Sequence, residues 1–213
     1  MKTDDLINAL AADAKSVEPP IARTLATAVA AGAAVSLALF LFTFGLRPDF
    51  SETASTSIRF MFKFVLTLSV AVPAFLLVRG LSRPDFDARR QLWWLALAPV
   101  LLLAGIFFEL MMLPAGEWEA RMMGHNSFYC LEVIPLLSLA PFAAVLYALK
   151  SGAPSNPVVA GAVGGLLSAG IAATLYASHC TDDSPLFVAL WYTISFILMG
   201  VLGAVVGSRL LRW

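Results

Sequence analysis

Six long apolar runs, each close to 20 residues, dominate this chain of 213 residues. The hydrocarbon core of a bilayer is about 30 Å thick, so a helix that rises 1.5 Å per residue needs roughly 20 apolar residues to cross it. Hydrophobic residues make up 60% of the chain and charged residues 13%, a composition typical of membrane proteins. The predicted spans are residues 24–46, 60–78, 92–113, 131–149, 158–177 and 186–210.

Helices are the expected structure of these runs. Ala, Leu and Gly dominate them, none alternates with a period of two, and an open sheet cannot satisfy its backbone in lipid. Prolines within spans two to four are tolerated there and can kink a helix. They are Pro73, Pro99, Pro135 and Pro141. The sequence therefore predicts an all-α bundle of six transmembrane helices, and the small residues of 161–170 (GAVGGLLSAG) predict close packing against a neighbouring span or a second copy.

The distribution of basic residues predicts the orientation of the spans. Ten lie on one side of the membrane: Lys2, Lys15, Arg23, Arg79, Arg83, Arg89, Arg90, Lys150, Arg209 and Arg212. Four lie on the other: Arg47, Arg59, Lys63 and Arg121. Because loops rich in Lys and Arg stay in the cytoplasm, both termini are expected there, and loops one, three and five are expected outside. The expected location is a bacterial inner membrane, with these loops in the periplasm.

The chain divides into two predicted parts, a cytoplasmic N-terminal segment of residues 1–23 and a transmembrane domain of residues 24–213. The first apolar run is too long for a signal peptide and follows an acidic leader, so we expect it to be retained as a span. With 14 basic and 14 acidic residues the net charge is zero, which gives no reason to expect direct nucleic-acid binding. The lipid bilayer is the one partner that composition implies.

Both cysteines and both histidines fall on the predicted outer side. His125 and Cys130 belong to GHNSFYC at the start of span four, and His179 and Cys180 open the stretch HCTDDSP before span six. In an oxidising compartment two such cysteines can form a structural disulfide. As free thiols they can instead act as a redox switch or, with the histidines, bind a soft cation. Two unlinked cysteines with no shared role remain a third interpretation.

The metal interpretation would use Cys130, Cys180, His179 and His125 as ligands. His-Cys neighbours rarely reach one ion together, so the pattern favours a cysteine pair over a site with four ligands. No obligatory cofactor is expected, and a transient metal ion at the outer cysteines is the only cofactor that these residues suggest.

The N-terminal segment MKTDDLINALAADAKS has the pattern of a short amphipathic helix. Thr3 can cap it, Asp4 and Asp5 suit the positive end of its dipole, and it should end before Pro19. Its apolar residues include Leu6, Ile7 and Leu10. A helix this short needs a partner surface, which could be the membrane, loops of the same chain or another protein. Because its polar face is acidic, a protein with a basic groove is favoured, although a solvated leader stays open.

Four features together resemble the NrsF-type membrane anti-sigma factors: the opening TDDLINALAAD, the six spans, Cys130, and the segment HCTDDSPLFVALWY (179–192). The resemblance covers essentially the whole chain. It implies that the cytoplasmic N-terminal segment holds an extracytoplasmic-function (ECF) sigma factor inactive, with Asp4, Asp5, Leu6, Ile7, Leu10 and Asp13 as contact candidates. It also implies that Cys130 and Cys180 sense heavy metals or oxidants, and that the protein is a regulator and not an enzyme.

Two other classes of protein stay open. A thiol oxidoreductase would also display outer cysteines, but it usually needs a Cys-x-x-Cys motif or a second pair, and this chain has neither. A small transporter would carry ionisable residues within its spans, and here there are few, chiefly Lys63 and Glu109. These two lie at similar depth, so the sequence predicts an ion pair between them. Oligomerisation is possible for any of these classes.

Overall fold

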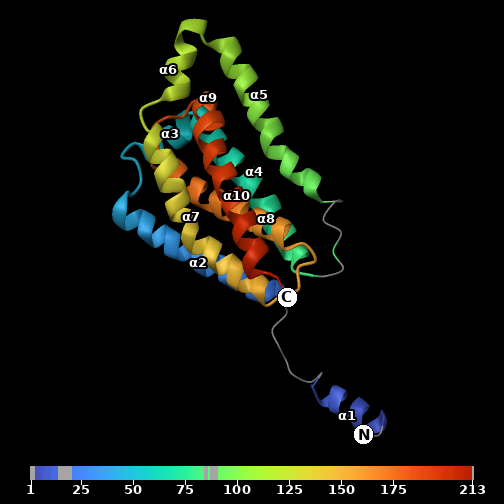
Figure 1. Cartoon of the computed structure of the whole chain (residues 1–213). Coiled ribbons are helices and arrows are strands. Elements are labelled where there is room, and N and C mark those ends of the chain that lie inside the picture. The colour runs from blue at the N-terminus through green and yellow to red at the C-terminus, as the bar shows by residue number, and fades with distance from the viewer. Residues whose placement is uncertain (1–2, 14–20, 84–85, 87–90, 213) are drawn as a thin grey trace.

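The computed structural model describes residues 3–13, 21–83, 86 and 91–212, and all regular structure within these residues is helical (Figure 1). For residues 9–13 it describes the backbone alone, so the side chains of Leu10 and Asp13 lie outside the description, as do Arg89 and Arg90 of the basic second loop. The longer helices are α1 (Thr3–Asp13), α2 (Ile21–Thr43), α4 (Ile58–Leu81), α5 (Leu97–Met112), α7 (Ser127–Lys150), α8 (Pro157–Ala177) and α10 (Thr193–Leu210). Shorter helices are α3 (Phe50–Thr56), α6 (Trp118–Met123) and α9 (Pro185–Phe187).

Three further segments complete the helical structure. Two are 3₁₀ turns, Leu92–Ala96 before α5 and Ala115–Glu117 before α6. The third, Val188–Tyr192, is a π-helical turn that joins α9 to α10.

The structure confirms the six predicted apolar spans, because six helical segments of the described chain are long and apolar enough to cross a membrane. The spans are Ile21–Thr43, Ile58–Leu81, Leu92–Met112, Ala115–Lys150, Pro157–Ala177 and Pro185–Leu210. The fourth differs most from its prediction, since α7 begins at Ser127 and not at residue 131. Cys130 therefore lies in the first turn of a helix and not in the loop before it.

Close backbone contact between α8 and α10 explains the small residues of the fifth span. A Cβ atom added to Gly161 would lie 2.1 Å from the carbonyl oxygen of Gly203, and one added to Gly165 would lie 2.0 Å from that of Met199. The small residues thus serve a neighbouring span of the same chain, one of the two predicted uses. Gly32 of α2 likewise packs on the backbone of Pro141 in α7. The prolines of α4 and α7 lie inside continuous helices, as expected.

The bundle has a proximal and a distal end. At the proximal end α2 begins at Ile21 and α10 ends at Leu210; at the distal end lie α3, α6, α9 and the stretch 178–184 (Figure 1). Both ends of the transmembrane domain thus share one end of the bundle. The charge distribution predicts that the proximal end is cytoplasmic, and that assignment stays a prediction.

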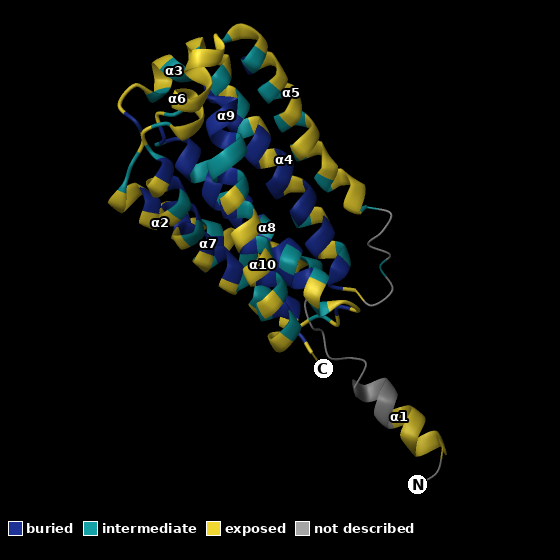
Figure 2. Ribbon diagram, turned by 45° about the horizontal axis from the view of Figure 1, so that its top comes forward, coloured by how far each residue is buried: buried dark blue, intermediate teal, exposed yellow. Residues whose placement is uncertain are grey.

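Helix α5 differs from the other spans in how little of it is buried. Glu109 is its only buried residue, whereas α4, α7 and α8 each bury many (Figure 2). It lies at the side of the bundle, where it contacts α4 and α9. The core is therefore formed mainly by α2, α4, α7, α8 and α10.

Candidate functional site

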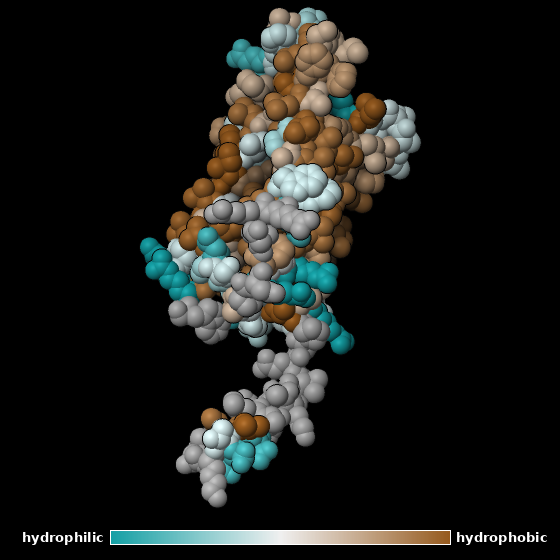
Figure 3. Space-filling model, turned by 90° about the vertical axis from the view of Figure 1, so that its right-hand side faces the viewer, coloured by the Kyte–Doolittle hydropathy of each residue, from teal (hydrophilic) through white to brown (hydrophobic). Residues whose placement is uncertain are grey.

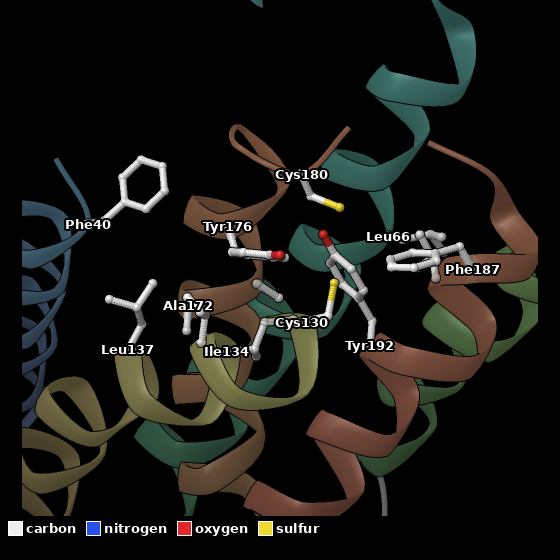
Figure 4. Packing of buried hydrophobic residues seen from close by; sticks show 13 residues of the cluster. Phe40, Leu66, Cys130, Ile134, Leu137, Ala172, Tyr176, Cys180, Phe187 and Tyr192 are labelled. Atoms are coloured by element: carbon white, nitrogen blue, oxygen red, sulfur yellow. The ribbon is translucent and has the colours of Figure 1, made fainter. Parts of the chain in front are cut away.

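Cys130 and Cys180 meet in the core at the distal end of the bundle. Both are free thiols with an exposed fraction of 0%, and they belong to one cluster of buried residues (Figure 4). Cys130 extends from the first turn of α7, and Cys180 follows the end of α8, where its backbone N–H donates to the carbonyl of Tyr176 at 3.0 Å. Their sulfur atoms face the same enclosed space (Figure 4). The sequence predicted their common end of the bundle but placed them in exposed loops, whereas helix packing encloses them.

Lys63 of α4 holds the chain around Cys180 in place. Its side chain, fully buried in α4, donates to the carbonyl of Cys180 at 2.8 Å and forms an ion pair with Asp183. A buried ammonium group is costly unless it is paired and hydrogen-bonded, and this one is both. The hydrogen bond from the Cys130 thiol lowers the pKa of Cys180, burial opposes this shift, and the charge of Lys63 adds to the lowering.

Arg47, in the turn after α2, also holds the stretch 178–184 in place. Its guanidinium group contacts the carboxylates of Asp183 at 3.1 Å and Asp49 at 2.7 Å. Its backbone N–H donates to the carbonyl oxygen of Ser178 at 3.2 Å. Hydrogen bonds from Arg47 hold the pKa of Asp49 well below its usual range. Asp183 therefore joins two cations from different parts of the chain, α4 and the turn after α2.

Asp182 caps the start of α7 from across the fold. Its carboxylate accepts the backbone N–H groups of His125 and Asn126 at 2.9 and 2.8 Å and the Asn126 side-chain amide at 2.9 Å. Partial burial by itself would raise the pKa of Asp182, but the hydrogen bonds from Asn126 and His125 outweigh it and lower the pKa. The stretch 178–184 is thus tied both to α4 and to the helix that carries Cys130.

The two histidines do not join the thiols. His125 is 95% exposed and lies 3.5 Å from Asp182, on the surface. His179 is half-buried, with Nδ1 3.1 Å from the carbonyl oxygen of Gly45 and its ring against Phe40 and Phe44. Of the four predicted ligands only the cysteines come together, and the described residues contain no group of three or more His, Cys, Asp or Glu side chains arranged to hold a metal ion.

Two tyrosine hydroxyl groups complete the surroundings of the thiols, and sequence reasoning missed them. Tyr176 and Tyr192 point toward the same space as Cys130 and Cys180 (Figure 4). Both hydroxyl groups are buried without a hydrogen-bond partner in the described chain. The signal available in the sequence was spacing, because Tyr176 precedes Cys180 by four residues, one helical turn. Tyr192 ends the π-helical turn, a feature common at functional sites, but this turn is visible only in the structure.

The comparison with known families identifies the chain. The model of the NrsF family, described as negative regulator of sigma F, matches residues 10–213. The chain belongs to the NrsF family. It is 36% identical to the anti-sigma-F factor NrsF of Caulobacter vibrioides (strain NA1000 / CB15N) and 33% identical to the probable anti-sigma-F factor NrsF of Azospira oryzae (strain ATCC BAA-33 / DSM 13638 / PS). Each alignment covers 100% of both chains. No solved structure matches significantly.

The NrsF family match starts at residue 10, so it includes the bundle and only the last part of the predicted sigma-contacting segment. In the structure this segment is the helix α1, with Asp4 and Asp5 in its first turn. Leu6 and Ile7 are 44% and 56% exposed. Two apolar side chains next to acidic ones are therefore open to solvent at the N-terminus of this family member.

The charges within the spans pair differently from the prediction. We expected Lys63 to pair with Glu109, but Lys63 pairs with Asp183, and Glu109 pairs with Arg59 at 2.8 Å and accepts a hydrogen bond from Ser184 at 3.1 Å. The sequence gives the depth of a residue along a helix but not the direction its side chain takes. The buried charges of Lys63 and Glu109 in this NrsF protein are thus compensated within the bundle.

Proposed function

We propose that this protein is an anti-sigma factor of the inner membrane that binds an ECF sigma factor through its cytoplasmic N-terminal segment. Oxidants or heavy metals at Cys130 and Cys180, on the periplasmic side, would release that partner. The family and the names of its two relatives support the regulatory role. The observation that carries the sensing role is the meeting of two free, buried thiols from different helices.

The thiol pair can undergo either of two reactions. A two-electron oxidant such as a peroxide would join the sulfur atoms; it takes two electrons and the two thiol protons and leaves as water. A soft divalent cation would instead displace both protons and bind the two thiolates. Either product links α7 to the chain after α8, which two separate thiols do not.

The contacts of Cys180 provide a route from this change to the rest of the bundle. Its carbonyl group is held by Lys63 of α4, and Asp182 beside it caps α7. A shift of Cys180 would therefore act on α4 and α7 together, and both helices run to the proximal end. A hundredfold change in sigma affinity needs about 2.7 kcal/mol of coupling.

A release assay tests the sensing role. The full chain, immobilised in detergent with its sigma factor, should lose the partner on exposure to cadmium or peroxide, with affinity falling about a hundredfold. A variant with Cys130→Ser and Cys180→Ser should keep it. Ala173→Ser is the matched control because it adds a hydroxyl group to the same buried cluster and leaves both thiols in place. Full release from the double cysteine variant would refute the sensing role.

The N-terminal helix is the proposed sigma-binding element. Leu6 and Ile7 offer apolar anchors, and Asp4, Asp5 and Asp13 favour a basic partner surface. The variant Leu6→Ser with Ile7→Ser should weaken sigma binding by at least about 2 kcal/mol, or roughly 30-fold, as measured by co-purification with the full chain. Asn8→Ser, in the same helix, should bind normally. Equal binding by all three proteins would place the contact elsewhere.

The alternative classes receive less support from the structure. The buried charges that a transporter would need are taken up by the pairs Lys63–Asp183 and Arg59–Glu109. A thiol oxidoreductase would need its cysteines to be reached by a partner, and both are enclosed.

A further inference from the structure

A groove of about 830 Å³ separates the proximal halves of α4 and α5. This volume is within the range of small-molecule sites, roughly 300–1,000 Å³. Its long walls are apolar and come from both helices. They include Val65, Leu68, Val72 and Leu76 of α4 and Leu97 and Leu101 of α5.

The groove exists because α5 is attached to the bundle by its distal half. The one buried residue of this helix, Glu109, is held there by Arg59 and Ser184. Farther toward the proximal end the side chains of α4 stay uncovered, and Val72 and Leu76 are 54% and 51% exposed. An apolar surface of this kind between two spans is open to lipid.

The proximal mouth of the groove is basic. Arg79 and Arg83 line it, together with Gln91, and none of the described residues of the lining is acidic. Within the part of the chain that the structure describes, neither guanidinium group is paired with a carboxylate. Residues 79–90, from the last turn of α4 to the start of the next span, include four Arg and two Asp residues. Two positive charges therefore remain even if each Asp pairs with one Arg.

Two tryptophans place this mouth at the level of the lipid headgroups. Trp93 and Trp94 stack with ring centroids 4.2 Å apart, both are exposed, and Trp94 lines the groove. Trp is enriched where the hydrocarbon core meets the headgroups. In Figure 3, which faces the side of the molecule where α5 lies, a broad hydrophobic surface gives way to hydrophilic side chains at the proximal end.

We propose that this groove is a binding site for an anionic phospholipid. An acyl chain lies between α4 and α5, and the phosphate group is held by Arg79 and Arg83. Arginine suits the phosphate because its planar fork can donate two hydrogen bonds to it. Basic pockets between transmembrane helices bind such headgroups in the same way. The site is independent of the thiol cluster and of any sigma factor.

Native mass spectrometry of the purified full chain tests the site. The protein is mixed in detergent with phosphatidylglycerol or with phosphatidylcholine of the same acyl chains, and the retained lipid is counted. Wild type should prefer phosphatidylglycerol by about tenfold, or ~1.4 kcal/mol. Arg79→Gln with Arg83→Gln should retain the two lipids equally. Arg209→Gln with Arg212→Gln, which removes two exposed charges at the same end but outside the groove, should keep the preference.

A second variant tests the groove itself. Val72→Trp fills it from α4 and leaves both arginines, so it should lower the retention of either lipid. Equal retention of the two lipids by wild type, unchanged lipid retention in Val72→Trp, or an unchanged preference in the double arginine variant would overturn the proposal. If lipid is retained only after residues 1–13 are removed, the groove is the binding site of the protein's own N-terminal helix. That result would also overturn the lipid proposal.

Discussion

Single residues in the stretch 178–184 have distinct partners, and this separates their roles. Asp183 binds Lys63 and Arg47, Asp182 caps α7, and Cys180 packs in one buried cluster with Cys130. Both acidic residues of this stretch thus have structural partners. The thiols are left as the reactive groups of this stretch.

Acid should weaken the cap at Asp182. Because the folded pKa of Asp182 is lowered, its stabilisation is complete above the unfolded value of about 4 and is lost as pH falls through the folded pKa. The melting temperature of wild type in detergent should therefore fall as pH drops from about 5 toward 3. Asp182→Asn should be less stable at neutral pH and show a flatter acid dependence. Glu119→Gln, which removes an exposed carboxylate from α6, should behave like wild type; an Asp182→Asn profile parallel to wild type would contradict the cap.

The sequence predicts how far along its helix a residue lies, but not which way its side chain points around the helix axis. Charge counting and span length put Cys130 and Cys180 at one end of the bundle, as observed. Their burial, and the two tyrosine hydroxyl groups beside them, depend on how α7, α8 and α10 rotate about their axes. The same rotation decides that Lys63 meets Asp183 and not Glu109.

At the scale of elements, small residues determine which spans touch. The backbones of α8 and α10 meet at Gly161, Gly165, Gly203 and Gly207, which leave no room for a side chain. The pattern of small residues was visible in the sequence, but it fitted a second copy equally well. The low burial of α5 was not visible, because its apolar composition is like that of the spans in the core.

Adding one methyl group to this contact should destabilise the bundle. In Gly165→Ala the new Cβ would lie 2.0 Å from a backbone oxygen, so α8 and α10 must separate, at a cost of about 1–3 kcal/mol or more. Gly200→Ala is the matched control, because its Cβ would meet only the Leu166 side chain at an ordinary 3.5 Å. Thermal unfolding in detergent should show a clear loss for the first variant and little change for the second. Equal melting temperatures would mean that the two helices are not in close contact.

At the scale of the whole molecule, the orientation of the bundle decides which stimuli reach the thiols and which partners reach α1. Ten of the 14 basic residues belong to segments that the sequence assigns to one side of the membrane, and the described ones among them, such as Arg79, Lys150 and Arg209, lie at the proximal end. The positive-inside rule therefore predicts that this end is cytoplasmic. Single exposed cysteines can test this, since the native pair is enclosed. Ser51→Cys lies in α3 at the distal end, and Ser151→Cys follows α7 at the proximal end; both positions are exposed.

In spheroplasts, whose outer membrane has been removed, a membrane-impermeant maleimide should label Ser51→Cys at once and Ser151→Cys only after lysis. The wild-type thiols should stay unlabelled until the protein is denatured, because neither has exposed surface. The reverse order for the two variants would place Cys130 and Cys180 at the cytoplasmic end and α1 outside. An outer α1 could not reach a sigma factor, so that one result would remove the sigma-binding proposal while leaving the lipid groove, which needs only a bilayer, in place.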